Sequence, residues 1–194
     1  MGKNNFVLGI CGKIGSGKTE VLNILHEQGW VTIDSDKIVH NLYEAGGAGQ
    51  RKITDFFGEE FLKKDGTVNR GKLRKVVFKD VKKLKILNTL IHPLVLSEIS
   101  KIIDKCDEGE KIAVEAIYFD EKFLGQIVDK ILWIDRPVPE IRKFLIKTRG
   151  FSEGIADNVL GLANTPVRVD AEVENNSTLK ALEKKVIIAV EKLI

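Results

Sequence analysis

Short runs of apolar residues alternate along the chain with segments that carry apolar residues at helical spacing. The apolar runs at 6–11, 30–33, 111–114 and 130–134 are typical of strands buried on both faces of a sheet. A less regular run at 168–173 predicts a last strand. Because strands that alternate with helices are joined by crossovers, we expect a parallel sheet covered by helices on both faces.

Helical spacing of apolar residues fills the intervals between these runs. The predicted helices are 19–28, 38–44, 51–57, 72–78, 81–103, 139–147, 152–162 and 179–194. Pro93 should interrupt the longest of them and start a new helix, because proline lacks a backbone N–H. The glycines at Gly46, Gly47 and Gly49 predict a flexible break before the third helix.

The bulk composition fits one globular domain, 1–194. Hydrophobic residues make up 43% and charged residues 30% of the 194 positions, which is ordinary usage for a folded protein. No strand pattern occurs between about 49 and 107, so this stretch is expected to form a helical lobe beside the sheet. No apolar run approaches membrane-spanning length and no signal-peptide layout opens the chain, so we expect a cytoplasmic protein with no membrane partner.

Charge and cysteine usage narrow the function classes. The net charge of +3 comes from lysines spread along the chain, whereas nucleic-acid-binding proteins usually carry a denser basic stripe. We therefore expect small polyanions as ligands and no nucleic acid. Cys11 and Cys106 lie far apart without metal-ligand spacing, which predicts buried, inert thiols rather than a disulfide.

The strongest chemical signal is a glycine-rich loop directly after the first predicted strand. It has the form Gly-x-x-x-x-Gly-Lys-Thr and opens a predicted helix, as a phosphate-binding loop (P-loop) requires. Its glycines let the backbone curl so that N–H groups point at phosphate oxygens, and the helix N-terminus adds partial positive charge. Lys18 would reach the β- and γ-phosphates of ATP, and the Thr19 hydroxyl would ligate Mg²⁺. The predicted ATP-binding residues are Gly12, Lys13, Ile14, Gly15, Ser16, Gly17, Lys18 and Thr19.

Two carboxylates, Asp34 and Asp36, follow the second predicted strand. Ligands of open parallel sheets bind beyond the carboxyl ends of the strands, where the phosphate loop also lies. One carboxylate could take a proton from an acceptor hydroxyl, and the other could help to organise Mg²⁺. The alternative is that one of them only caps the following helix. We favour the catalytic interpretation because two carboxylates share this edge with the loop.

Two other classes of nucleotide-binding protein fit the sequence less well. Switch GTPases read guanine with Asn-Lys-x-Asp, which is absent from the sequence, and the Asp-x-x-Gly match at 55–58 ends an amphipathic helix instead of following a buried strand. An alternative function is that of a non-catalytic nucleotide-binding regulator whose helical lobe binds a partner. The presence of Asp36 together with Lys18 and Thr19 argues against it.

Nearly the whole chain resembles the dephospho-CoA kinase family. The resemblance is carried by the P-loop and by the segments 33–40, 57–78, 91–94 and 173–177. It implies a three-layer α/β P-loop NTPase/kinase fold with a five-stranded parallel sheet, a helical acceptor lobe and a lid at about 138–165. It also implies transfer of the ATP γ-phosphoryl group to the ribose 3′-hydroxyl of dephospho-CoA, the small-molecule substrate.

The same resemblance implies roles for single residues. Asp36 would be the general base, Lys18 and Arg149 would be further catalytic groups, and Asn175 would lie near the adenine end of the ATP site. The acceptor would be contacted by Asp36, His40, Arg70, Arg74, His92 and Asp120. A structural role is the alternative for His40. Arg149 could neutralise charge on the transferred phosphoryl group or be a solvated cation at a helix end, and the sequence leaves both open.

Several positions depart from the family pattern. Lys13 replaces a glycine of the loop, Lys143 replaces a lid arginine, Asn164 replaces a glutamine, and the segment 116–120 is a loose version of the family's motif. The alternative within enzymes is another small-molecule or nucleoside monophosphate-type P-loop kinase. A monomer or a weak homo-oligomer is expected.

Overall fold

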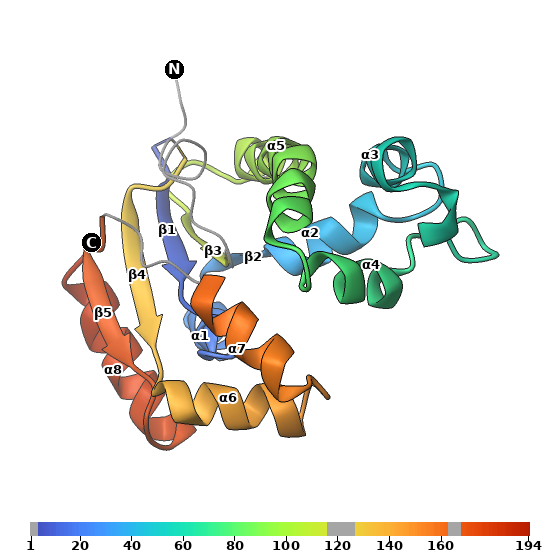
Figure 1. The fold of residues 1–194 in the computed structure, drawn as a ribbon. Coiled ribbons are helices and arrows are strands. Elements are labelled where there is room, and N and C mark those ends of the chain that lie inside the picture. Colours follow the sequence, from blue (N-terminus) through green and yellow to red (C-terminus); the bar gives the residue numbers. More distant parts are fainter. Residues whose placement is uncertain (1–3, 116–126, 163–167) are drawn as a thin grey trace. The chain divides into compact units, whose positions relative to one another are not determined.

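Two compact units make up the chain in a computed structural model, which describes residues 4–115, 127–162 and 168–194 (Figure 1). The sheet unit comprises Met1–Asp34 and Ile102–Ile194, and the helical unit comprises Ser35–Lys101. The sequence predicts a helical lobe at about 49–107. The helical unit begins earlier, at Ser35, because helix α2 (Ser35–Leu42) follows strand β2 without a loop.

Five parallel strands form the sheet, in the order β2-β3-β1-β4-β5 (Figure 1). The strands are β1 (Phe6–Cys11), β2 (Val31–Asp34), β3 (Lys111–Glu115), β4 (Lys130–Asp135) and β5 (Ala171–Glu174). The predicted five-stranded parallel sheet is confirmed. The last strand starts at Ala171 and not at 168. The backbone N–H of Ile131 in β4 donates to the side-chain carboxylate of Asp170 at 2.8 Å, so this N–H is not available for a strand hydrogen bond to the backbone.

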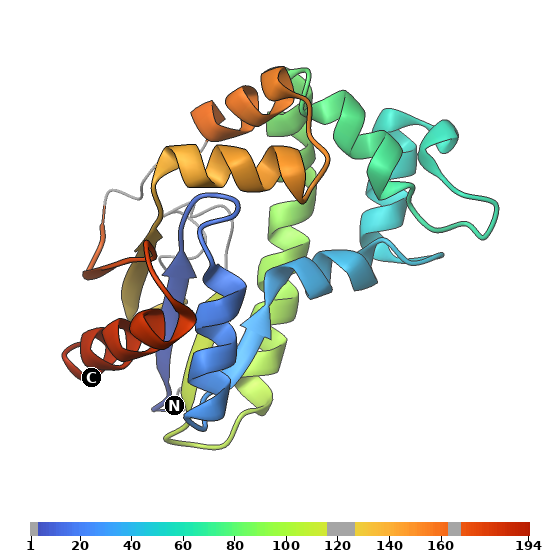
Figure 2. The same ribbon diagram turned by 90° about the horizontal axis from the view of Figure 1, so that it is seen from below.

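Helices α1 (Lys18–Glu27) and α8 (Leu179–Glu191) lie side by side on one face of the sheet (Figure 2). Their apolar stripes bury Val21 and Val186 against strand residues such as Leu8 and Leu132. Removal of this apolar area from water is the main stabilising term of the unit. Two further helices, α6 (Val138–Lys147) and α7 (Glu153–Leu162), follow β4 as a hairpin.

The helical unit contains no strand among its described residues. After α2 come α3 (Ala48–Phe57), the short 3₁₀-helix η1 (Glu59–Phe61), α4 (Arg70–Val77) and α5 (Val81–Lys105), which runs on into the sheet unit. The expectation of a strand-free lobe in this part of the chain agrees with the structure.

The predicted interruption at Pro93 is wrong, because α5 continues through it as one helix. Proline cannot donate to the carbonyl of the residue four positions before it, which is Thr89 here. Both Pro93 and Thr89 are exposed, so water can satisfy that carbonyl and the helix tolerates the missing bond.

The predicted break at 46–49 is shorter than expected, because Gly46 and Gly47 lie in the connection between α2 and α3, whereas Ala48 and Gly49 already belong to α3. Helix α3 starts at Ala48, and Gly49 is buried within it. A Cβ added at Gly49 would lie 2.9 Å from the Leu42 carbonyl oxygen and 3.1 Å from Tyr43 Cδ1. This glycine therefore allows the start of α3 to pack closely against the end of α2.

Helix α5 has the length of a membrane span, and an 18-residue stretch of it has a mean hydropathy of 1.3 with 17% of that stretch buried. The helix contains no continuous apolar run of that length, as expected from the sequence. Polar residues such as Asn88, Thr89 and His92 break the apolar runs, while the average hydropathy stays high. Length and composition are weak arguments for a membrane span, since core helices of globular proteins share them.

Both cysteines are buried and neither forms a disulfide, as predicted. Cys11 ends β1 directly before the phosphate loop, and burial raises the pKa of its thiol to about 12. Cys106 bonds through its sulfur to the Ile102 carbonyl at 3.3 Å. A thiol with a raised pKa is a poor nucleophile, so Cys11 is inert at neutral pH.

Candidate active site

The predicted phosphate loop joins β1 to α1 at the carboxyl end of the central strand. Gly15 (φ 79°) and Gly17 (φ 102°) adopt backbone conformations that other residues rarely take. At Gly15 an added Cβ would also lie 2.8 Å from a ring carbon of Phe144, and at Gly17 it would collide with the side chain of Asn175. The loop conformation therefore requires glycine at both positions.

Lys18, the predicted phosphate ligand, is the first residue of α1 and is only 4% exposed. Its ammonium donates to the carbonyl of Gly12 at 3.0 Å and to that of Lys13 at 3.1 Å. An ammonium has three N–H donors, and in this position it can exchange these carbonyls for phosphate oxygens. Lys18 therefore lies against the loop, and its role as a phosphate ligand stays a prediction.

Two side chains from other elements brace the loop. The Asn175 amide, after β5, donates to the Ser16 carbonyl at 2.8 Å, and the Arg136 guanidinium, after β4, donates to the Gly15 carbonyl at 3.1 Å. Carbonyls that accept these bonds are held in place, which leaves the loop N–H groups available to an anion. The resemblance placed Asn175 near adenine, whereas its contact in the structure is with the loop.

Replacing Asn175 by alanine is expected to raise the KM for ATP about tenfold, because one bond that holds the loop is lost. The KM for the acceptor should stay within about twofold. Steady-state kinetics would measure both values. Asn176→Ala is the matched control, because the Asn176 side chain contacts Lys185 and not the loop. An unchanged KM for ATP in the Asn175 variant would contradict this bracing role.

A buried carboxylate that the sequence analysis missed lies next to the loop. Glu115 ends β3, directly opposite Ile10 of the neighbouring strand β1, and is 5% exposed. The Thr19 hydroxyl donates to it at 3.2 Å. Its only sequence signal is a carboxylate at the end of an otherwise apolar strand. Among the described residues no cluster of three His, Cys, Asp or Glu side chains could hold a metal.

The α6–α7 hairpin, where the sequence predicts a lid, is joined by charged contacts. Arg142 of α6 bonds both carboxylate oxygens of Asp157, at 2.8 and 3.4 Å, and lies 3.4 Å from the Glu153 carboxylate. The hydrogen bond from Arg142 lowers the pKa of Asp157. The planar guanidinium suits this two-oxygen contact and fixes the angle between the two helices.

Arg149 lies beyond the end of α6 and stacks on the Phe144 ring, 5.6 Å from its centre. The same ring packs on Gly15 of the phosphate loop. The arginine is exposed, and among the described residues it makes no hydrogen bond or ion pair with the loop. Its position next to a ring that touches the loop favours the lid interpretation, while the role itself stays a prediction.

Of the residues predicted to bind the acceptor, the structure brings His40 and Arg70 together and places the other described ones elsewhere in the helical unit. Asp36 lies in the first turn of α2, and His40 lies in its last turn. His40 Nδ1 is 3.3 Å from Arg70 of α4, so the structure brings these two residues together. Arg74 on α4 and His92 on α5 are outside the pocket that His40 and Arg70 line.

Asn164 and the segment 116–120, which includes Asp120, lie outside the described residues.

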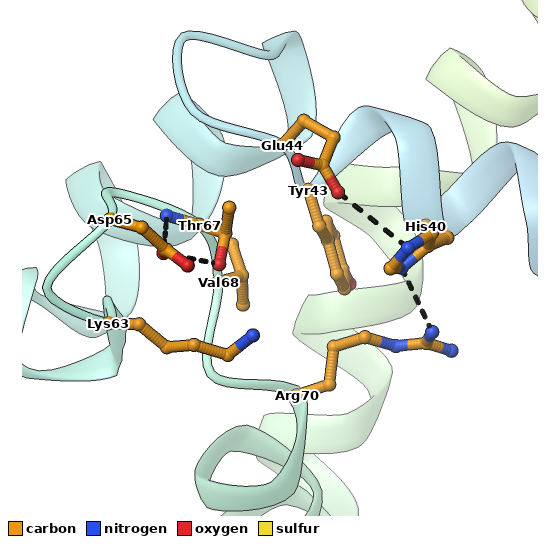
Figure 3. A pocket seen from close by; sticks show the side chains of 8 residues that line it. All are labelled: His40, Tyr43, Glu44, Lys63, Asp65, Thr67, Val68 and Arg70. Carbon is orange, nitrogen blue, oxygen red and sulfur yellow. Dashed lines mark hydrogen bonds and ion pairs between the residues drawn. The ribbon is translucent and has the colours of Figure 1, made fainter.

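A pocket of about 190 Å³ lies wholly within the helical unit (Figure 3). Its lining comes from the end of α2 and from the turn between η1 and α4: His40, Tyr43, Glu44, Lys63, Asp65, Thr67, Val68 and Arg70. Only His40 and Arg70 of this set were predicted. Lys63 and Tyr43 carry no motif, so their meeting becomes visible only in the folded unit.

The fold and the phosphate loop define a P-loop kinase. Dephospho-CoA kinase from Campylobacter jejuni matches with a TM-score of 0.58 and 19% identity, over 97% of both chains. Shikimate kinase from Acinetobacter baumannii matches with a TM-score of 0.57 and 15% identity, over 98% of this chain and 95% of that one. At these identities the likeness shows the fold.

The family follows from sequence comparison. The model of the dephospho-CoA kinase family matches residues 6–165. The dephospho-CoA kinase of Carboxydothermus hydrogenoformans is 31% identical over 195 residues, which cover 96% of this chain and 93% of that protein. The chain belongs to the dephospho-CoA kinase family, as the resemblance implies.

Proposed function

We propose that this protein transfers the γ-phosphoryl group of ATP to the ribose 3′-hydroxyl of dephospho-CoA and releases coenzyme A and ADP. The observation that carries the proposal is a complete phosphate loop, with Lys18 buried against it, in a chain that the dephospho-CoA kinase family model matches over 6–165. ATP is the phosphoryl donor that a kinase of this family uses. The acceptor distinguishes this activity from that of other P-loop kinases.

Mg²⁺ would be held by Thr19 and Glu115. The Thr19 hydroxyl and the Glu115 carboxylate, 3.2 Å apart, are hard oxygen donors of the kind that Mg²⁺ prefers. Magnesium is usually bound by one or two protein oxygens together with phosphate oxygens and water, so this small donor set fits. When bound, the ion neutralises charge on the β- and γ-phosphates.

Replacing Glu115 by glutamine is expected to raise the Mg²⁺ concentration for half-maximal activity about tenfold, because an amide lacks the charge that attracts the ion. Magnesium titrations of activity, and calorimetry of ADP binding with and without Mg²⁺, would measure this. Glu110→Gln is the control, since that side chain accepts from the Asp107 backbone N–H before β3. An unchanged magnesium requirement, with magnesium-dependent ADP binding intact, would contradict the assignment.

Asp36 is proposed as the base that takes the proton from the 3′-hydroxyl. It lies two residues after the end of β2, and the carboxyl end of β2 is at the same edge of the sheet as the end of β1. Its side chain is exposed in the first turn of α2, so it is accessible to an acceptor. The α6–α7 hairpin with Arg149 is proposed as the lid that excludes water during transfer.

A panel of acceptors tests the proposed function. ATP consumption would be followed by a coupled assay with dephospho-CoA, AMP, shikimate and gluconate as separate acceptors. Turnover that depends on dephospho-CoA, at least about a hundredfold above the other acceptors in kcat/KM, is expected because the specific contacts differ between them. A folded sample that binds ATP and shows no turnover with dephospho-CoA would overturn the proposal.

A further inference from the structure

We infer that the pocket of the helical unit is an anion subsite that binds the diphosphate of dephospho-CoA through Lys63, Arg70 and Tyr43. The identity of the ligand rests on the proposed function, whereas the subsite itself rests on the pocket. Its lining combines two cationic side chains with a buried hydroxyl, within a cavity of about 190 Å³ (Figure 3).

The two cationic side chains of the pocket, Lys63 and Arg70, have N–H groups that are not used in hydrogen bonds within the described part of the protein. Within the described part of the chain, the Lys63 ammonium makes no hydrogen bond or ion pair. Arg70 uses one N–H of its guanidinium on His40, and a guanidinium offers five. In Figure 3 the Arg70 side chain lies below the Tyr43 ring, and the Lys63 amine points from the left toward the middle of the pocket. Unused cationic donors that face one cavity are what a diphosphate requires.

Tyr43 supplies a neutral donor to the same place. The residue is 6% exposed, and its hydroxyl end is directed toward Arg70 in Figure 3. Burial raises the pKa of the hydroxyl to about 12, although the Arg70 charge acts in the opposite direction. The hydroxyl therefore keeps its proton at neutral pH and can donate it to a phosphate oxygen.

His40 and Glu44 orient Arg70. A guanidinium can only donate, so the 3.3 Å contact between Arg70 Nη1 and His40 Nδ1 requires that Nδ1 accept. The imidazole proton is then on Nε2, which faces the Glu44 carboxylate at 3.7 Å. This chain of contacts fixes the direction of the guanidinium. His40 is thus a positioning residue, which agrees with the structural alternative for it.

Two carboxylates, Glu44 and Asp65, also line the pocket, and each has a polar partner that holds it in place. Glu44 faces His40, and Asp65 accepts from the Thr67 backbone N–H at 2.9 Å and from its hydroxyl at 2.7 Å. The hydroxyl bond from Thr67 is the main cause that lowers the pKa of Asp65. The Lys63 charge also acts on Asp65 and lowers its pKa further.

The spacing along α2 fits the acceptor. Asp36 and His40 are four residues apart, which is about 6 Å along a helix that rises about 1.5 Å per residue. In dephospho-CoA the 3′-hydroxyl and the 5′-diphosphate are separated by the ribose and one methylene, a span comparable to one helical turn of about 5.4 Å. An acceptor whose hydroxyl lies at Asp36 can therefore reach the pocket with its diphosphate.

The test is a comparison of Lys63→Gln with Lys64→Gln, an exposed neighbour that does not line the pocket. Calorimetry would measure the Kd for dephospho-CoA and for adenosine, a probe without a diphosphate, and coupled kinetics would measure KM and kcat. Lys63→Gln is expected to weaken dephospho-CoA binding about tenfold at low salt and less at high salt, because a charged hydrogen bond is lost. Adenosine binding, kcat and the KM for ATP should not change, and Lys64→Gln should behave as the parent protein.

The outcomes separate the two hypotheses. If the parent protein turns over dephospho-CoA but Lys63→Gln binds it unchanged, or loses adenosine affinity equally, the subsite is overturned and the proposed function stands. If the parent protein binds dephospho-CoA in a Lys63-dependent way without turnover, the subsite stands and the proposed function is overturned. Absence of both binding and turnover overturns both.

Discussion

Replacing Asp36 by asparagine is expected to lower kcat about a thousandfold, because an amide cannot take the proton of the acceptor hydroxyl. The two side chains have nearly the same size, and position 36 is exposed in the first turn of α2, so the fold should not change. The Kd for ATP should stay within about twofold, since ATP is bound by the phosphate loop. Coupled kinetics and calorimetry of ATP binding would measure both effects.

The matched control for Asp36 is Asp55→Asn, which changes an exposed aspartate on α3 of the same unit. It should retain the parent activity. If Asp36→Asn turned over at a rate similar to that of the control, Asp36 would not be the base, and its carboxylate would act only at the start of α2.

Replacing Lys18 by alanine is expected to lower kcat/KM about a thousandfold and to weaken ATP binding at least about tenfold. The ammonium is buried and bonded to two loop carbonyls, so its loss removes a charge from the phosphate site and a brace from the loop. Single-turnover kinetics would separate the loss in the transfer step from the loss in binding.

Lys184→Ala, which removes an exposed lysine of α8, is the control for Lys18. Thermal unfolding of both variants would show whether the loop or the whole sheet unit is affected. A Lys18→Ala variant with normal kcat/KM would contradict the assignment of the loop as the catalytic phosphate site.

The sheet and the phosphate loop could be predicted because their signals are local. Three of the strands, β1, β3 and β4, are largely apolar runs with buried side chains, as a sheet covered on both faces requires, whereas the edge strand β2 buries only Ile33. The glycines and Lys18 of the loop follow the first run directly, and the structure places them as the motif predicts. Both the strands and the loop can be recognised from residues that are adjacent in the sequence.

The residues that the sequence did not reveal depend on contacts between distant segments. Glu115 gains its meaning from the strand order, which puts the end of β3 next to β1 and Thr19. Arg136 follows β4 and meets Gly15 only because β4 pairs with β1. No local pattern encodes which strands are neighbours.

In the helical unit, too, local sequence patterns did not predict features that depend on the folded structure. Pro93 predicts a helix end by a local rule, yet its exposed position allows the helix to continue. The pocket joins Tyr43, which follows α2, to Lys63 and Arg70 in and after the turn that leads to α4. Its charge and hydroxyl donors come together only through folding.

The product of the reaction tests the central claim most directly. The chain would be incubated with ATP, Mg²⁺ and dephospho-CoA, and the products would be examined by ³¹P nuclear magnetic resonance together with quantitation of ADP. The expected result is one new phosphate monoester on the ribose 3′-oxygen for each ADP formed, with no ADP formed when dephospho-CoA is omitted. ADP formation at the same rate without dephospho-CoA, or a phosphate on any other oxygen of the acceptor, would contradict the proposed function.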